Sequence, residues 1–290
     1  MTANTSTRAK RPTAERLGFM QGRLSPLVDG KIQAFPWDDW EAEFPGAARL
    51  GLKLIEWTLD HDHLSENPIM TDGGRQEIRA LAAQNSISVA ALTGDLFMQA
   101  PFWKVAGSER DALIAEFDTV IDAAAALGVG TVVVPLVDNG SLETAAQEAV
   151  LVDVLAERTA DLRRRGVLVA FESDYAPDTL RHFIERLPAE AYAINYDIGN
   201  SAALGYDCGE EIVAYADRIA HVHVKDRVRG GTTVPLGTGA AEIGRAIRLL
   251  EQNGYAGNYV LQTARAADGD HAGALARYQD MVLGWIAAGA

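Results

Sequence analysis

The 290-residue sequence has very little cysteine, and this shortage limits the kinds of site it can build. Cys208 is the single cysteine, so an intrachain disulfide and a thiolate metal cluster are both excluded, which indicates a reducing compartment. Apolar runs are also short, because no stretch of about 18 apolar residues is uninterrupted and no apolar signal segment follows the polar first fifteen residues. We therefore expect a cytoplasmic protein without a membrane partner.

Positive charge is scarce as well. The chain has 26 Lys and Arg against 40 Asp and Glu, which gives a formal net charge of −14. This balance repels nucleic acid phosphates and anionic membranes. With 48% hydrophobic residues, 27 Gly and only 10 Pro, the composition is that of a folded globular enzyme. We expect a small-molecule partner and no nucleic acid partner.

Eight short apolar segments alternate with helical segments along the chain, and no Pro- or Ser-rich linker separates them. A single α/β barrel of this kind runs to roughly 250 residues. We predict one (β/α)8 barrel over residues 16–290, with right-handed crossovers, after a disordered tail over residues 1–15. The expected strands are Arg16–Gly22, Leu52–Trp57, Ser88–Thr93, Thr131–Leu136, Val167–Glu172, Ala193–Asp197, Ile219–Lys225 and Tyr259–Gln262.

The intervening helices are predicted from apolar spacing, caps and glycine stops. A capping box is expected near Ser141, at the start of the helix that finishes on three arginines. The other expected helices are Trp37–Leu50, Arg75–Gln84, Ser108–Leu127, Asp178–Arg186, Gly209–Ala216, Ala240–Asn253 and Asp270–Ala287.

Four predicted strands in the second half carry a polar side chain at or near the C-terminal end. VLVAFE ends at Glu172, YAINYD ends at Asp197, IAHVHVKD contains His223, and NYVLQ ends at Gln262. The C-terminal ends of parallel barrel strands meet at one mouth, so these side chains are expected to converge. Carboxylate and imidazole donors suit Mn²⁺, Co²⁺, Zn²⁺ or Mg²⁺, and Gln262 could add a neutral oxygen. Each acid alone could equally begin a helix or loop, but the combination favours a metal site.

Two further residues of the same mouth have alternative interpretations. His221 and His223 point to the same face of a strand, so either could be the ligand. His223 is nearer the C-terminal end, whereas His221 would lie one layer deeper and support the ligands from the core. Glu56 ends its predicted strand, and it could donate or accept a hydrogen bond with a ligand hydroxyl or pair with an arginine such as Arg23.

A glycine-rich loop, GGTTVPLGTG, follows Lys225 and Arg227. In one interpretation the backbone N–H groups around Gly237 and Gly239 hold an anionic group, together with Arg227 and with or without Arg265. In the other, it is a flexible hairpin-like loop with solvated charges.

Aromatic residues are expected in the loops above the mouth. They are Trp37, Phe97, Phe102 and Trp103. Such residues can stack on the apolar face of a ligand, cover a site as a lid, or form the contact of a homo-oligomer.

The segments FES, YDIGNSAALGYD, HVHVKDR and PLGTGAAEIGRAIRLLEQNGYAGNYVLQ resemble the xylose-isomerase-like TIM-barrel superfamily of sugar and sugar-phosphate isomerases and epimerases. The opening GFMQGRLSP and LKLIEW resemble its first two strands, so the resemblance spans essentially the whole chain. It implies a TIM barrel whose metal is held by Glu172, Asp197, His223 and Gln262. The superfamily includes ketose 3-epimerases, sugar-phosphate epimerases, inosose dehydratases, hydroxypyruvate isomerases and endonuclease IV. The glycine-rich loop resembles that of the sugar-phosphate members, which implies a phosphorylated or carboxylated substrate.

The chain departs from the ketose epimerases of this superfamily at two positions. They have a second acid–base glutamate on strand eight, where this chain has Gln262, which cannot take a proton. Many relatives have a histidine that contacts substrate or metal where this chain has Asn200. The resemblance therefore implies proton transfer by Glu172 alone, which favours aldose–ketose isomerisation, or a second donor such as Glu56 or Lys225.

We predict a divalent-metal-dependent isomerase or epimerase of a sugar or sugar phosphate, acting through an enediolate with Glu172 moving the proton. The alternative is a lyase that expels a β-hydroxyl from a keto-sugar or an inosose through the same enolate. A nucleic acid hydrolase would need additional His and Asp ligands and a basic groove. A non-catalytic sugar-binding module would bind its ligand without exchanging a substrate proton with solvent.

Overall fold

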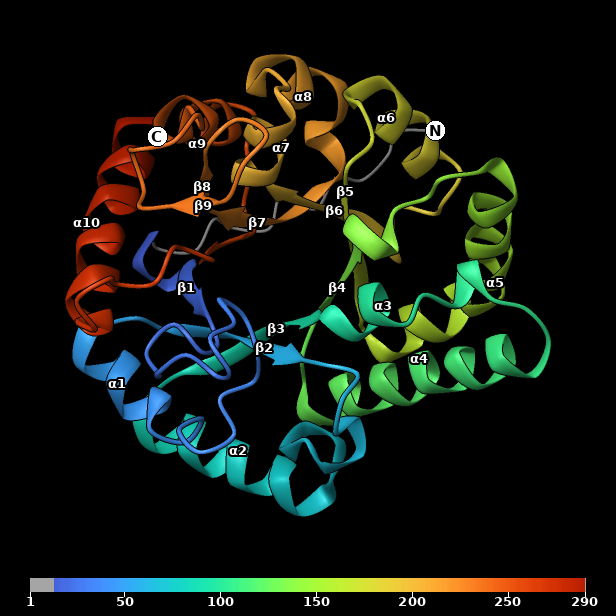
Figure 1. Cartoon of the computed structure of the whole chain (residues 1–290), viewed down its shortest axis with the longest axis horizontal. Helices are drawn as coiled ribbons and strands as arrows, with labels where there is room; N and C mark the ends of the chain where they lie inside the picture. The colour runs from blue at the N-terminus through green and yellow to red at the C-terminus, as the bar shows by residue number, and fades with distance from the viewer. Residues whose placement is uncertain (1–12, 290) are drawn as a thin grey trace.

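A computed structural model describes residues 13–289 of the chain. Eight parallel strands form a closed barrel in the order β1-β10-β7-β6-β5-β4-β3-β2, and helices surround it (Figure 1). The predicted (β/α)8 architecture is confirmed. Most of the predicted disordered tail, residues 1–12, lies outside the described residues, and Thr13–Glu15 form a 3-10 helix.

The barrel strands are short and rich in β-branched and aromatic residues, as expected for strands that are covered by helices on one face and packed inside the barrel on the other. Every predicted strand segment overlaps an observed strand, and the ends differ by no more than about two residues. The barrel strands are β1 (Leu17–Met20), β2 (Leu54–Leu59), β3 (Ser88–Gly94), β4 (Thr131–Leu136), β5 (Leu168–Ser173), β6 (Tyr192–Asp197), β7 (Ile219–Val224) and β10 (Asn258–Leu261).

The main helices follow the predicted order, but four starts need correction. The helix expected from Arg75 begins three residues earlier, at Asp72, and the one expected from Ala240 begins three residues later, at Ile243. The helix expected from Trp37 begins at Glu43, because Pro36–Ala42 form hydrogen-bonded turns instead. The helix expected to open at Ser141 is capped by Thr144, whose side chain accepts the amide of Gln147 at 3.2 Å. The main helices are α1 (Glu43–Leu50), α2 (Asp72–Asn85), α4 (Gly107–Leu127), α5 (Ala145–Arg165), α6 (Pro177–Glu185), α8 (Cys208–Tyr215), α9 (Ile243–Gln252) and α10 (His271–Gly289).

Additional short elements stand at the C-terminal ends of the barrel strands, and the sequence analysis missed them. Helix α3 (Asp95–Gln99) follows β3 directly, and α7 (Ile198–Leu204) follows β6 directly. The glycine-rich loop contains β8 (Asp226–Arg227) and β9 (Thr233–Val234), which pair in antiparallel fashion. Residues of α3, α7 and β8 contribute to the wall of the barrel mouth.

Three of the aromatic residues predicted to lie above the mouth are buried, which corrects that expectation. Phe97 packs against Phe117 with ring centroids 5.3 Å apart, and Phe102 packs against Trp103. The indole N–H of Trp103 donates to the carbonyl of Gly140 at 3.1 Å. Trp37, 38% exposed, is the one of the four that reaches the surface.

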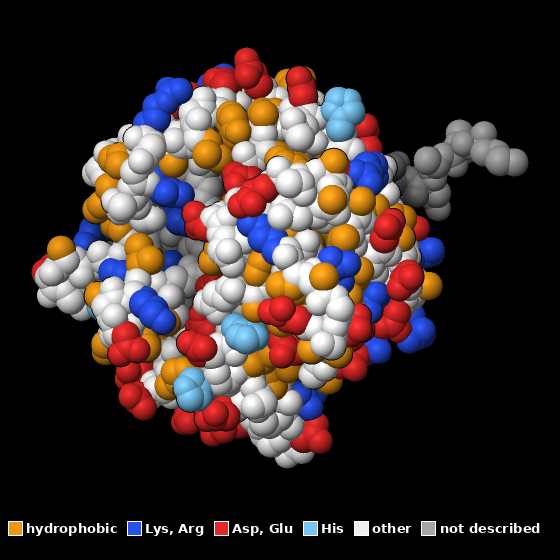
Figure 2. All heavy atoms as spheres, turned by 45° about the vertical axis from the view of Figure 1, so that its right-hand side comes forward, with side chains coloured by type: hydrophobic (Ala, Val, Ile, Leu, Met, Phe, Trp, Pro, Cys, Tyr) orange, Lys and Arg blue, Asp and Glu red, His pale blue; other side chains and the backbone are white. Residues whose placement is uncertain are grey.

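The outer surface mixes charges of both signs. Acidic and basic side chains are interspersed over the face in Figure 2, and the basic ones do not merge into a continuous patch there. Within residues 13–289, no helix combines the length and the apolar character that crossing a bilayer requires.

Candidate functional site

Three successive strands bring Glu172, Asp197 and His223 together at the barrel mouth. Asp197 and His223 are neighbours in the β6–β7 register, and Glu172 lies near the end of β5. His223 Nδ1 is 3.1 Å from Glu172 Oε2 and 3.9 Å from Asp197 Oδ2. One ligand atom from each residue lies within 4.8 Å of the other two, and all three side chains are buried. This is the convergence that the strand ends predicted, and it could hold one metal ion.

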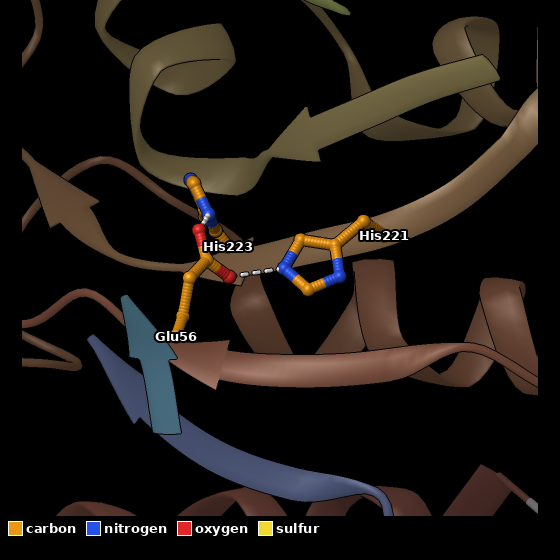
Figure 3. A group of neighbouring side chains, drawn as sticks. All are labelled: Glu56, His221 and His223. Carbon is orange, nitrogen blue, oxygen red and sulfur yellow. Dashed lines mark hydrogen bonds and ion pairs between the residues drawn. The ribbon is translucent and has the colours of Figure 1, made fainter. Parts of the chain in front are cut away.

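Glu56, on β2, contacts both His223 and its strand neighbour His221 (Figure 3). Its Oε1 is 2.8 Å from His223 Nε2, while Oε2 pairs with His221 Nε2 and Thr93 donates its hydroxyl to Oε1. Burial would raise the pKa of Glu56, but the two adjacent imidazoles outweigh burial and hold it well below its usual range. Glu56 is fully buried and does not line the cavity at the mouth, which corrects the expectation that it faces a substrate. His221 occupies the deeper layer, as expected.

The position of Glu56 decides which nitrogen of His223 could bind a metal. Glu56 accepts a hydrogen bond at Nε2, so Nδ1 is the nitrogen that faces the carboxylates of Glu172 and Asp197. A carboxylate that holds the second nitrogen of a metal-bound histidine fixes the orientation of the ring and raises its basicity. Glu56, His221 and His223 also satisfy the spacing of a metal site, but none of these three residues lines the cavity at the mouth, whereas Glu172 does.

The side-chain amide of Gln262 has one atom in a hydrogen bond and the other without a partner. The hydrogen bonds of Arg23 and Gln33 show which of the two atoms is without a partner. Arg23 can only donate, so the Gln33 atom that it reaches at 3.2 Å is the acceptor Oε1. The same oxygen accepts from Gln262 Nε2 at 2.8 Å. Gln262 Oε1 is therefore left buried, without a hydrogen-bond partner among the described residues. An orphaned oxygen at the end of β10 fits a fourth, neutral metal ligand.

The donor set fits a divalent cation. Two carboxylates, an imidazole nitrogen and an amide oxygen match the ligand types of Mn²⁺, Mg²⁺, Co²⁺ and Zn²⁺. Burial raises the pKa of Asp197, although the charge of Lys225 acts in the opposite direction. Burial also acts to raise the pKa of Glu172, but the hydrogen bond with His223 and the charge of Lys225 outweigh it and lower that pKa. Glu56 and Glu172 raise the pKa of His223 to about 10 despite its burial. Negative charge therefore dominates around the imidazole of His223, as a cation site requires.

Asn200 connects the carboxylates to the basic residues of the mouth. Its amide nitrogen donates to Glu172 Oε1, and its backbone N–H donates to Asp197 Oδ1 at 2.8 Å. Its side-chain oxygen accepts from Lys225 Nζ at 3.3 Å and from Arg227 Nη1 at 2.8 Å. Lys225 Nζ also lies 3.2 Å from Asp197 Oδ2. Helix α7, absent from the sequence prediction, is the element that places this asparagine.

The glycine-rich loop does not offer the predicted anion cradle. The amides of Gly237 and Gly239 donate to Asp226 Oδ2 at 2.8 and 2.9 Å, so both already have an anionic acceptor inside the protein. Arg265 donates to the carbonyls of Gly22 and Ser25, and it is not part of the cavity wall. Of the proposed anion-binding residues, Arg227 is the one that lines the cavity.

A cavity of about 450 Å³ opens at this mouth, above Glu172. Its size and polar wall suit a small hydrophilic ligand. Asp95, at the start of α3, belongs to this wall and was not among the predicted site residues, although it follows the end of β3 directly. The polar residues of the wall include Gln33, Asp95, Asp138, Glu172, Asp174, Asn200, Lys225, Arg227 and Gln262.

A closed parallel barrel with converging carboxylates and an imidazole at its C-terminal mouth is the arrangement of the metal-dependent TIM-barrel enzymes. The chain belongs to the xylose isomerase-like TIM barrel family, whose model matches residues 44–280.

Comparison with individual proteins gives the same architecture. The chain is 28% identical over 262 residues to the L-ribulose-5-phosphate 3-epimerase UlaE of Escherichia coli strain SMS-3-5, covering 84% of this chain and 88% of that protein. Among solved structures, a xylose isomerase-like TIM barrel protein from Mycobacterium smegmatis in complex with magnesium aligns with a TM-score of 0.67 and 17% identity, over 94% of this chain and 97% of the other. The IOLI protein with a bound zinc atom aligns with a TM-score of 0.72 and 16% identity, over 93% and 98%.

Proposed function

We propose that this protein is a divalent-metal-dependent isomerase or epimerase of a sugar or sugar phosphate. The observation that carries the proposal is the convergence of Glu172, Asp197 and His223 beneath a polar cavity, with the oxygen of Gln262 free nearby. Family membership and the similarity to a ketose-phosphate epimerase support a carbohydrate substrate.

The chemistry needs a base beside a carbon that is next to a carbonyl. A divalent cation at this site would supply Lewis-acid polarisation of the neighbouring carbonyl and hydroxyl oxygens of the substrate. Glu172 then removes the proton from that carbon, and the electron pair of the C–H bond enters the double bond of the enediolate. Hydrogen bonds from Asn195 at 2.9 Å and from Asn200 fix the carboxylate of Glu172 for this transfer.

Arg227 is the residue we propose for recognising a phosphate. Its guanidinium lines the cavity, donates to Asn200 and also holds the carbonyl of Gly231 at 2.7 Å. This hydrogen bonding fixes the fork of the side chain, which lowers the entropic cost of binding an anion. L-ribulose 5-phosphate, the substrate in the name of the E. coli relative, is therefore a reasoned first probe.

Deuterium incorporation from D₂O tests the proposal directly. The protein loaded with Mn²⁺ should exchange a carbon-bound proton of one member of a panel of ketoses and ketose phosphates, and exhaustive chelation should abolish the exchange. Glu172→Gln should abolish exchange, whereas Glu190→Gln, a change of the same kind on the surface, should not. Absence of exchange across the panel would contradict the proposal, and release of water from the substrate would indicate a lyase instead.

A further inference from the structure

Gln33 holds the side-chain amide of Gln262, and it comes from outside the barrel strands. It lies in the segment 21–42, which connects β1 to α1, and β1 is the neighbour of β10 in the barrel. Gln33 Oε1 accepts from Gln262 Nε2 at 2.8 Å, and Gln33 Nε2 donates to Asp95 Oδ2 at 2.6 Å. The β1–α1 loop, residues 21–42, is therefore bonded directly to the residue at the end of β10.

The backbone on both sides of Gln33 is held in place. The carbonyl of Ile32 accepts from Arg23 Nη1 at 3.0 Å, and the amide of Phe35 donates to Asp60 Oδ2 at 3.0 Å. These contacts fix the loop where the side chain of Gln33 leaves it. The side chain therefore has little freedom to lose when a ligand binds, which lowers the entropic cost of binding.

Arg23 determines which end of the Gln33 amide faces Gln262. Its guanidinium can only donate, and it reaches Gln33 Oε1 at 3.2 Å. A reversed Gln33 amide would set an NH₂ group against this guanidinium, donor against donor. The two lone pairs of Gln33 Oε1 are therefore shared between Arg23 and Gln262, and Gln33 presents an acceptor to Gln262.

An acceptor at this place selects one orientation of the Gln262 amide. The NH₂ group turns to Gln33, and Oε1 is left buried without a hydrogen-bond partner among the described residues. In the reversed orientation, the oxygens of Gln262 and Gln33 would face each other as two acceptors. The NH₂ group of Gln262 would then occupy the place of the free oxygen, and an NH₂ group cannot bind a cation.

The other three proposed ligands are each oriented by a neighbouring residue in the same way. The pairs are Asn195 with Glu172 at 2.9 Å, the backbone N–H of Asn200 with Asp197 at 2.8 Å, and Glu56 with His223 at 2.8 Å. Removal of such a partner typically lowers metal affinity by about 10- to 100-fold. Gln33 is the corresponding partner of Gln262.

We propose that Gln33 is a positioning residue for the metal site: it accepts from the amide nitrogen of Gln262 and so keeps the amide oxygen of Gln262 available to a divalent cation. The inference rests on the proposed function, which supplies the cation, and it adds the β1–α1 loop to the site. The coupling is reciprocal, because a contact that favours metal binding is itself strengthened when the metal binds. A bound cation should therefore hold Gln33 and its loop more firmly.

Gln33→Met removes the amide of Gln33 while keeping an unbranched side chain of similar length. The affinity for Mn²⁺, measured from the electron paramagnetic resonance signal of the free ion, should fall by about tenfold. The matched control is Gln76→Met, at an exposed glutamine of α2 far along the chain from the site residues. The control should bind Mn²⁺ as the wild-type protein does.

A second background separates positioning from general support of the loop. Gln262→Leu removes the proposed fourth ligand, so Gln33→Met in this background should lower Mn²⁺ affinity by less than twofold further, because its effect passes through Gln262. A residue that only supported the fold would cause the same loss in both backgrounds, since independent effects on the binding free energy add.

The results that would overturn the inference are distinguishable from failure of the proposed function. Wild-type affinity in Gln33→Met, or an equal loss in the two backgrounds, would refute the role of Gln33 and leave the proposed function intact. Absence of Mn²⁺ binding by the wild-type protein would refute the proposed function and this inference with it. If Gln33→Met does not fold, hydrogen–deuterium exchange of the wild-type protein decides. Bound Mn²⁺ should slow exchange of the backbone amides in residues 30–36, and equal exchange with and without Mn²⁺ would contradict the proposal.

Discussion

Replacing Glu56 by Gln removes one negative charge from beside the metal site while preserving the shape of the side chain. In the native site, Glu56 Oε1 accepts from His223 Nε2 at 2.8 Å and leaves Nδ1 facing Glu172 and Asp197. The amide oxygen of the variant can still accept from His223, but its NH₂ group must then face His221. The hydrogen bond that orients the imidazole of His223 is kept, but its acceptor is now an uncharged amide.

The size of the effect follows from this partial replacement. Loss of a carboxylate that orients a metal-bound histidine typically lowers metal affinity by about 10- to 100-fold, or roughly 1.4–2.7 kcal/mol. We expect the lower end of this range if the amide oxygen continues to face His223, and the upper end if the amide turns its NH₂ group toward His223. The variant should fold, because glutamine has nearly the same shape and volume as the glutamate it replaces.

Competition of Mn²⁺ between the protein and a chelator of known affinity measures this change at pH 7.5. The matched control is Glu211→Gln, another buried glutamate, which accepts from Tyr196 and Tyr215 on the far side of β6 and has no contact with the site. The control should bind Mn²⁺ as the wild-type protein does. Unchanged affinity in Glu56→Gln, within twofold of the control, would refute the role assigned to Glu56.

Arg227→Ala should raise KM for a phosphorylated substrate by about tenfold and leave KM for the unphosphorylated sugar unchanged, since one charge-assisted hydrogen bond is lost; equal effects on both would exclude a phosphate contact. Gln262→Glu should tighten Mn²⁺ binding by about tenfold or more in the same competition assay, because it adds a negative ligand, and weaker binding would contradict the ligand set. Arg16→Met should destabilise the protein by about 3–5 kcal/mol in urea unfolding, because the buried guanidinium binds Glu251 at 3.0 Å, and a loss below about 1 kcal/mol would show that the pair is dispensable. Asp95 binds more protons in the folded state, where its pKa is about 7, than in the unfolded state, where it is near 3.8, so its contribution to stability should fall as pH rises from about 4 to 7. The free energy of unfolding of Asp95→Asn, relative to that of the wild-type protein, should therefore be more favourable at pH 8 than at pH 4. An equal difference at the two pH values would refute the shifted pKa.

The barrel and three of its predicted ligands followed from local sequence features. Buried parallel strands are continuous apolar runs, so their ends can be located within about two residues. A polar residue at such an end has a nearly fixed position, which is why Glu172, Asp197 and His223 could be grouped before any coordinates were known. Whether these three hold a metal in the protein stays a prediction.

The depth of a side chain within the barrel could not be predicted in the same way. Glu56 lies near a strand end in the sequence, yet its side chain is fully buried and contacts His221 and His223 instead of lining the cavity. The hydrogen-bond pattern of Gln33 depends on Arg23 and Gln262, which are distant in the sequence, so no local pattern encodes it. Asp95 had the signal of a polar residue after a strand, and it was the candidate that strand-end reasoning could have found.

The identity of the metal site is tested most directly by anomalous diffraction from a crystal of the protein soaked with Mn²⁺. We predict a single peak about 2.0–2.3 Å from Glu172, Asp197 and His223 Nδ1, with Gln262 Oε1 as the fourth protein ligand. A peak between Glu56, His221 and His223, or no peak near Glu172 at saturating Mn²⁺, would contradict the account.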